Sequence, residues 1–340
     1  MTSVVRFRRR LHLFLGLLAL AGGLLARATD GAPADYDYWA VGDPAAATPG
    51  RTETGLMLMG GSDDVDAAFR WFIQRAGGGR IVILRASGSD DYNDYLFKQL
   101  GGVVSVESVR FHNRAAAHDP RVLAIIRHAD GIFLAGGDQA NYVNFWRGTP
   151  VNDALDAHVR AGRPIGGTSA GLAILGAYSY GSLDGGSLLP DVALRDPLGP
   201  AVTLVKDFLH LPYLEHAITD SHFSARHRLG RLVTFVARLA AEQDDPALFG
   251  IGVDEKTALC IDARGEGRVF TGAQGRAWLV FPRQPAETLV AGRPLRIADV
   301  RVVTLDPDSR FDLKTRAIQR PAAAYRASAQ DGELTLQPEP

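Results

Sequence analysis

A serine between glycines is the residue of this sequence best suited to chemistry. Ser169 lies in Gly167-Thr168-Ser169-Ala170-Gly171, which matches the G-x-S-x-G pattern of a nucleophile elbow. In such an elbow, a sharp turn between a strand and a helix exposes the serine hydroxyl for attack on a carbonyl carbon. Small residues also suit a tight turn that only serves packing. The motif by itself therefore leaves a nucleophile and a packing turn equally open.

A nucleophilic serine needs a neighbouring base, for which histidine is the first choice. Among the nine histidines, His222 is the leading candidate because its segment, TDSHFSARHRLGRL, lies between a predicted strand and a predicted helix. His216, near or within that strand, is the second candidate. The competing interpretation of TDSH is a helix cap formed by Asp220 and Ser221. Other histidines lie in charged helical or loop settings that indicate solvated side chains: His112, His118, His128, His158 and His227.

The acid that would orient the base is marked less clearly. Asp254 and Glu255 stand together in GIGVDEKTAL, between two short predicted strands. An exposed charged turn is one interpretation of this segment. Gly250 and Gly252 favour another, because glycine inside a strand often marks a close approach of backbone. Both interpretations stay open on the residues alone.

The elements that would position these residues alternate between strand and helix. The alternation predicts an α/β protein with a doubly wound, mostly parallel sheet and helices on both faces. Glycine pairs 60–61, 136–137 and 166–167 lie at the carboxyl ends of predicted strands, where ligands gather in such sheets. The predicted strands are 55–61, 80–87, 103–111, 131–137 and 163–168, with helices at 62–79, 91–102, 121–130 and 151–162.

The second half of the chain predicts a β-rich C-terminal extension. A helix is expected over 224–243, strands over 248–253, 256–262 and 298–305, and a hairpin over 268–281. We expect a polar lead-in over 29–52, a single α/β domain over 53–320 and a polar, frayed tail over 321–340.

The N-terminus has the pattern of a secretory signal. A basic segment, MTSVVRFRRR, precedes the apolar run LHLFLGLLALAGGLLA and the small-residue site Ala26-Arg27-Ala28. A membrane anchor is the alternative, since such a run could nearly span a bilayer. The cleavage site favours removal of residues 1–28. The sequence thus predicts a secreted or periplasmic protein that meets a membrane only transiently.

Composition excludes several other classes of function. Removal of residues 1–28 leaves 32 basic and 38 acidic residues, a net charge of −6, and no basic tract that suits nucleic acid. Cys260 is the only cysteine, so neither an intrachain disulfide nor a cysteine-based metal site is expected. We expect Cys260 to be a buried thiol, and we expect no metal and no cofactor. A homodimer is the default oligomer for such a fold.

Four separated segments together resemble a known family. GIFLAGGDQANYVNFW, PIGGTSAGLAILG, ITDSHFSARHRLGRL and GIGVDEKTAL occur in the order seen in cyanophycinases, serine exopeptidases grouped with aspartyl dipeptidase as S51 peptidases. The resemblance covers roughly residues 53–265. It implies a class I glutamine amidotransferase-like (flavodoxin-like) fold, in which those enzymes carry a cysteine where this chain has Ser169. It also implies that Ser169 is the nucleophile, His222 the general base and Glu255 the orienting acid.

The resemblance extends to the rest of the site. It implies an oxyanion hole of backbone N–H groups from Ala170 and from Gly136 or Gly137. The order Ser, His, Glu differs from the Ser, acid, His order of α/β-hydrolases, which argues against a lipase or esterase. The family's substrate-lining positions correspond to Gln139, Asp220, Ser221, Arg226, Arg228 and Arg231.

The implied substrate is cyanophycin, an aspartate backbone that carries arginine on each β-carboxylate, cut to β-aspartyl-arginine. Arginine binds carboxylates bidentately, so Arg226 and Arg231 would face inward. Asp138 and Asp254 are candidates for the substrate guanidinium. Ser221 stands where the family often has glutamine. Short aspartyl or isoaspartyl peptides therefore stay open as substrates, and a non-catalytic binding protein is a further alternative.

Overall fold

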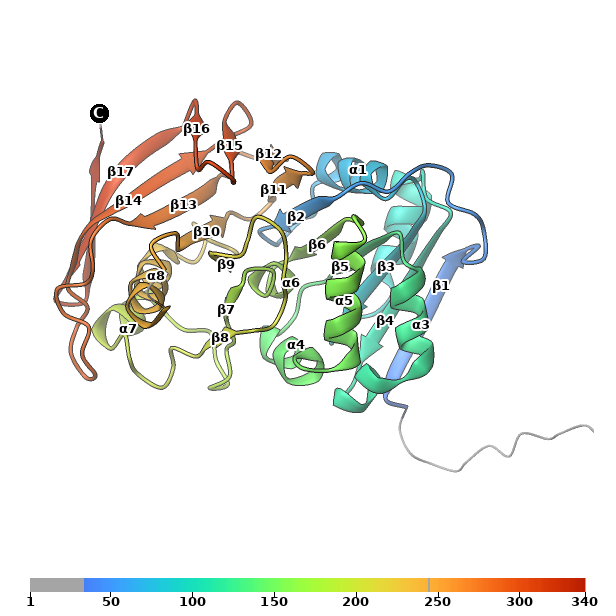
Figure 1. Ribbon diagram of the computed structural model, residues 1–340, viewed down its shortest axis with the longest axis horizontal. Helices are drawn as coiled ribbons and strands as arrows, with labels where there is room; N and C mark the ends of the chain where they lie inside the picture. Colours follow the sequence, from blue (N-terminus) through green and yellow to red (C-terminus); the bar gives the residue numbers. More distant parts are fainter. Residues whose placement is uncertain (1–33, 244, 340) are drawn as a thin grey trace, which may run out of the picture. The chain divides into compact units, whose positions relative to one another are not determined.

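A ten-stranded mixed sheet is the framework of the part of the chain that the computed structural model describes, residues 34–243 and 245–339 (Figure 1). The predicted secretory signal, residues 1–28, lies outside the described residues. Five adjacent strands of this sheet, from β4 to β2, are parallel, and the outer strands are antiparallel. In sheet order the strands are β1 (Tyr36–Gly42), β4 (Ser105–Phe111), β3 (Arg80–Arg85), β5 (Gly131–Leu134), β6 (Ile165–Thr168), β2 (Gly55–Met59), β11 (Thr257–Asp262), β12 (Glu266–Thr271), β15 (Arg310–Asp312) and β16 (Ile318–Gln319).

Helices cover both faces of the parallel strands, because these strands are apolar on both sides. In β2, Leu56 and Leu58 pack in one core, and Met57 and Met59 pack in another. The first core includes α3 (Pro120–His128), α4 (Gln139–Trp146) and α5 (Pro150–Arg160), with the 3₁₀ turn η2 (Arg114–His118). The second includes α1 (Asp66–Arg75) and a π-helical segment, η1 (Tyr95–Leu100), that continues α2 (Asp91–Asp94).

The predicted mixed α/β class is thus confirmed, with helices on both faces. The flavodoxin-like, doubly wound strand order is not confirmed. The first parallel strand, β2, lies at the end of the parallel set beside β6, so the order is β4-β3-β5-β6-β2. A flavodoxin-like sheet would place its first strand inside the set.

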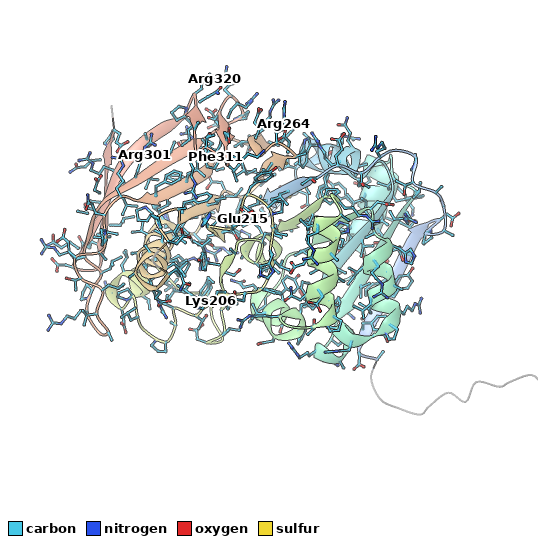
Figure 2. All side chains as sticks on the ribbon, in the orientation of Figure 1. Lys206, Glu215, Arg264, Arg301, Phe311 and Arg320 are labelled. Carbon is cyan, nitrogen blue, oxygen red and sulfur yellow. The ribbon has the colours of Figure 1, made fainter. Side chains whose placement is uncertain are left out.

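A second sheet of eight strands follows from the later part of the chain. In sheet order its strands are β18 (Glu333–Pro338), β17 (Ala323–Gln330), β14 (Ile297–Leu305), β13 (Ala277–Pro282), β10 (Phe249–Val253), β9 (Ala217–Asp220), β7 (Tyr178–Tyr180) and β8 (Leu204–Lys206). One face packs against α8 (Leu229–Gln243) and α7 (Pro190–Arg195). The other face contributes to the same core as the first sheet. Phe311 of β15, labelled in Figure 2, meets Phe249 of β10 edge to face at 6.2 Å between ring centres.

Three expectations about local structure were wrong. The lead-in over 29–52 contains β1, which pairs with β4 and donates a hydrogen bond from Tyr38 to Glu107. The segment 268–281 is not a hairpin, because β12 joins the first sheet and β13 joins the second. The tail over 321–340 forms β17 and β18, an antiparallel pair that extends β14. The residues that β17 buries, Ala327 and Ala329, are alanines, which give a weak hydrophobic signal.

Two further findings concern the cysteine and the length of the helices. Cys260 in β11 is buried, as expected, and burial raises the pKa of its thiol well above the ordinary value. Among the described residues, the helices are all too short or too polar to cross a membrane.

The C-terminal strand pair yields a stability prediction. Ala327 of β17 is fully buried, whereas Gln330 at the end of the same strand is exposed. Ala327→Asp should lower the free energy of unfolding by about 2 kcal/mol or more, because it buries an unpaired carboxylate. The matched variant Gln330→Asp should change it by about 0.5 kcal/mol or less. Urea denaturation measures both; equal, small effects would show that the segment does not pack.

Candidate active site

Ser169 lies on a strained turn between β6 and α6 (Ala170–Ala173). Its backbone has φ 53° and ψ −114°, a conformation that non-glycine residues rarely adopt. A Cβ on Gly167 would lie 2.6 Å from the backbone carbon of Gly171, and a Cβ on Gly171 would lie 2.1 Å from the carbonyl oxygen of Leu134. Both glycines are therefore required by close backbone packing, and the turn leaves the serine side chain partly exposed.

The structure brings Ser169, His222 and Glu255 into one hydrogen-bonded chain. The Ser169 Oγ lies 2.7 Å from Nε2 of His222, and Nδ1 of His222 lies 2.7 Å from Oε1 of Glu255. A carboxylate at Nδ1 holds the proton there, which leaves Nε2 free to accept the serine hydroxyl proton. The arrangement has the geometry of a nucleophile, a base and an orienting acid.

His222 is held in a turn rather than in a helix cap. It follows β9, has φ 45°, and donates its backbone N–H to the carbonyl of Gly60 at 2.7 Å. The helix begins only at Leu229, later than the sequence pattern predicts. A Cβ on Gly61 would lie 2.5 Å from the His222 ring, so this position must be glycine for the ring to lie where it does.

Asp254 fixes the turn that carries the acid. Its carboxylate accepts hydrogen bonds from the Ser224 backbone N–H at 2.9 Å and hydroxyl at 2.6 Å, from Trp278 Nε1 at 3.1 Å and from the Arg276 backbone N–H at 2.9 Å. These four donors tie the segment after His222 to the β10–β11 turn. The expectation that Asp254 binds a substrate guanidinium is therefore wrong, because its oxygens are already occupied.

Burial and nearby charges set the basicity of His222. Burial lowers the pKa of His222 below the ordinary value, and the hydrogen bond to Glu255 acts in the opposite direction. The positive charges of Arg226 and Arg228 lower this pKa further. The imidazole thus stays neutral, and able to accept a proton, to a lower pH than a solvated histidine.

A cavity of about 280 Å³ opens beside Ser169. It contains most of the residues proposed from the sequence for the oxyanion hole and for substrate binding. The lining residues are Gly137, Asp138, Gln139, Ser169, Ala170, Ser182, Gly185, Gly186, Ser187, Ser221, His222, Arg226 and Arg228. Gly136 lies next to the nucleophile, since a Cβ built on it would be 3.4 Å from the Ser169 Cβ. The Gln139 amide is held by the carbonyl of Tyr180 at 3.4 Å.

Asp220 and Arg231 do not line this cavity, contrary to the sequence-based expectation. Both are buried, and Arg231 donates to the two carboxylate oxygens of Asp220 at 2.7 and 2.5 Å. The guanidinium also lies 5.1 Å from the centre of the Tyr180 ring and donates to the Leu188 carbonyl at 3.1 Å. A buried carboxylate requires such a partner, so Arg231 pairs with Asp220 behind the residues that line the cavity.

The cavity has an excess of positive charge. Arg228 is buried at the wall, where burial lowers its pKa to about 10, so it remains charged at neutral pH. It donates to the Ser221 carbonyl at 2.9 Å. Arg226 is exposed to the cavity. The acid in the lining, Asp138, accepts from the backbone N–H of Ala140 as the cap of α4. The site therefore favours an anionic ligand.

Several residues were missed or misjudged from the sequence. The loop over 182–187 forms one wall of the cavity. In the sequence, only its glycine and serine residues could have indicated a loop close to a ligand. His158 is buried rather than solvated, with a pKa lowered to about 4 by burial. His216, the second candidate base, pairs with Asp245 at 2.8 Å. Among the described residues, no group of His, Cys, Asp and Glu could hold a metal ion.

Comparisons with known proteins agree with the family resemblance. The family model "Peptidase family S51" matches residues 56–265. A cyanophycinase of Synechococcus elongatus is 31% identical over 280 residues, which cover 78% of this chain and 80% of that protein. A cyanophycinase of Trichormus variabilis is 28% identical over 286 residues, which cover 80% and 89%. Among solved structures, a peptidase from an acI-B1 Actinobacterium is 17% identical with a TM-score of 0.49, and covers 77% of this chain and 98% of that one.

The charges around His222 predict a pH dependence. Covalent labelling of Ser169 by a serine-reactive phosphonate should require neutral His222, so its rate should fall only below pH ~6.5, the ordinary histidine pKa. Arg226→Gln removes a positive charge that lowers the pKa of His222, and should move this acid limb to higher pH. Arg264→Gln, at an exposed arginine outside the cavity, should leave the limb unchanged. An acid limb above pH ~6.5 in the unsubstituted protein would contradict this account.

Proposed function

The chain belongs to peptidase family S51 and is a serine-type peptidase, and from this premise we propose that it is an exopeptidase that hydrolyses cyanophycin to β-aspartyl-arginine. In this proposal Ser169 forms an acyl-enzyme, His222 transfers the protons and Glu255 orients the histidine. The observation that carries the proposal is the hydrogen-bonded chain of these three side chains at the edge of a positively charged cavity. The two cyanophycinase relatives support the choice of substrate.

Acylation would begin with attack of the Ser169 Oγ on the scissile carbonyl carbon. His222 Nε2, 2.7 Å from that oxygen, takes the hydroxyl proton as the new C–O bond forms. Glu255 stabilises the imidazolium that results through its bond to Nδ1. When the tetrahedral intermediate collapses, the C–N bond breaks and His222 returns the proton to the leaving amine. A water molecule then attacks the acyl carbon and gives its proton to His222. The C–O bond to Ser169 breaks, and His222 returns the proton to the Ser169 Oγ.

Backbone N–H groups would stabilise the tetrahedral oxyanion. The candidates are Ala170, which follows the nucleophile at the start of α6, and Gly136 or Gly137, which follow β5 beside it. Such donors are fixed before the reaction, so they need no reorganisation when the charge develops. Loss of one donor of this kind costs other hydrolases about 10²- to 10³-fold in kcat.

The charges of the cavity support a carboxylate-bearing substrate. Arg226 and Arg228 would bind a carboxylate next to the scissile bond, because guanidinium and carboxylate form charge-assisted hydrogen bonds. A second candidate function, hydrolysis of short aspartyl or isoaspartyl peptides, is favoured by the size of the cavity, about 280 Å³. Ser221 lines this cavity in place of the glutamine that is frequent in the family. Hydrolysis of the polymer measured beside that of the dipeptides distinguishes the two substrates.

Hydrolysis of insoluble cyanophycin beside soluble β-aspartyl and isoaspartyl dipeptides tests the proposal. The unsubstituted protein should release β-aspartyl-arginine from the polymer, and Ser169→Ala should lower kcat by about 10³-fold or more. Ser328→Ala, which removes a serine hydroxyl in β17, is the matched control and should retain full activity. Turnover of dipeptides without release from the polymer would select the second function. Cleavage by a folded Ser169→Ala protein would refute the mechanism.

We also propose that residues 1–28 direct export and are then removed. The support is the order of a basic segment, an apolar run and a small-residue site in the sequence. Expression of the full chain in a bacterium should give an extracytoplasmic protein that begins at Thr29. Ala28→Leu should block this cleavage, because signal processing requires a small residue there. Mass spectrometry of the N-terminus reads both results; an exported protein that retains Met1 would contradict the proposal.

A further inference from the structure

Ser187 occupies an unusual position among the hydroxyl groups of the cavity. It lies in the loop before α7, is exposed and lines the cavity. Its Oγ accepts a hydrogen bond from Nη2 of Arg228 at 3.1 Å and another from Nη1 of Arg231 at 3.4 Å. A guanidinium group has N–H donors and no hydrogen-bond acceptor, so in both contacts the serine oxygen is the acceptor.

This geometry fixes what the hydroxyl hydrogen can do. A serine oxygen has two lone pairs and one O–H donor, and the two arginines occupy both lone pairs. Within the described residues, the Ser187 Oγ makes hydrogen bonds with these two arginines only. The O–H group is therefore left to point away from the arginines. Two positive charges on the acceptor side also polarise the O–H bond and make it a stronger donor.

The wall behind Ser187 keeps a net positive charge. Arg228 and Arg231 are both buried, and both contact one carboxylate, that of Asp220. One positive charge in this group is thus uncompensated, and Arg228 is the member that reaches the cavity. A hydroxyl donor beside an uncompensated guanidinium is suited to an anion with two acceptor oxygens.

We propose that Ser187 is a substrate-binding residue whose hydroxyl donates to a substrate carboxylate that Arg228 binds at the same time. The inference rests on the proposed function for the choice of substrate. A cyanophycin chain offers two sources of this carboxylate, the C-terminal aspartate and the arginine joined to each β-carboxylate. Loss of a hydrogen bond to a charged group corresponds to about a ten- to hundredfold loss of affinity.

A synthetic dimer of the β-aspartyl-arginine unit tests the inference in three forms: the free acid, the form with an amidated C-terminal aspartate, and the form with amidated arginines. Ser187→Ala should raise KM for the free acid about ten- to hundredfold and change kcat little. Ser187→Ala should have little effect on KM for the amidated form in which the bound carboxylate has been removed. That form therefore shows whether the bound carboxylate belongs to the C-terminal aspartate or to an arginine. Ser187→Thr keeps the hydroxyl and should restore KM to within about threefold of the unsubstituted value. Equal KM changes on all three forms would overturn the inference.

Two further variants separate direct contact from an effect on the loop or on Arg228. Ser182 lines the same cavity, but its hydroxyl donates within the loop to the carbonyl of Gly186. Ser182→Ala should therefore leave the ratio of acid to amide KM unchanged. In an Arg228→Gln background, Ser187→Ala should still raise KM for the free acid. If it does not, Ser187 acts only by positioning Arg228, and direct donation is refuted.

Failure of the proposed function can be distinguished from failure of this inference. If the unsubstituted protein cleaves no form of the dimer, the proposed function fails and binding is measured instead. Calorimetric titration of Ser169→Ala with β-aspartyl-arginine, as free acid and as its amides, then gives the acid-to-amide affinity ratio with and without Ser187→Ala. A ratio that Ser187→Ala abolishes supports the carboxylate contact. An unchanged ratio, or absence of binding, overturns it.

Discussion

Three consecutive carbonyl groups at the end of β2 hold the candidate active site together. The carbonyl of Met59 accepts from the backbone N–H of Ser169 at 3.1 Å, that of Gly60 from His222 at 2.7 Å, and that of Gly61 from Lys256 at 2.9 Å. Each bond reaches one of the three segments that carry the serine, the histidine and the acid. Because β2 lies between β6 and β11 in the first sheet, its end is the place where all three segments can meet. The side-chain geometry depends on this backbone junction.

The same junction explains why strained backbone persists at all three positions. Ser169, His222 and Lys256 have φ values of 53°, 45° and 55°, which are unfavourable for residues with a side chain. Such conformations cost about 1–3 kcal/mol each and persist only where the surroundings fix them. A Cβ on Gly60 would lie 1.9 Å from the Asp254 carbonyl oxygen. Residue 60 must therefore be glycine for the backbone at Asp254 to approach this closely. Asp254 then supplies the hydrogen bonds that stabilise the turn on its far side.

The sequence predicted the parts of the site that local sterics define, and missed those that tertiary pairing defines. The Ser169 elbow was recognisable because its glycines are required within a few residues of the serine. Glu255 is joined to His222 only by tertiary contact, so the family resemblance, rather than any local pattern, singled it out. Arg231 was expected to face the substrate because it is one of several arginines in a helical pattern. Its pairing with Asp220 depends on where the helix starts, and turns at His222 and His227 delay that start to Leu229. Strand β1 was missed because its partner, β4, is distant in the sequence and its side chains are only partly buried. Strand β17 was missed because the side chains that it buries are alanines.

The two buried arginines beside Asp220 have different roles: Arg231 stabilises the cavity wall, and Arg228 brings positive charge to the cavity. Asp220 binds Arg231 on both carboxylate oxygens, which leaves Arg228 with one weak contact to it at 3.4 Å. Removing Asp220 would leave two buried guanidinium groups without a counter-charge, whereas replacing Arg228 would leave the Asp220–Arg231 pair intact. The two arginines are therefore not equivalent, although they lie close together in the sequence. Arg231 secures the loop through Leu188, and Arg228 presents to the cavity the positive charge that the pair does not neutralise. The positive charge of the cavity thus follows from an imbalance of buried charge as well as from the exposed Arg226.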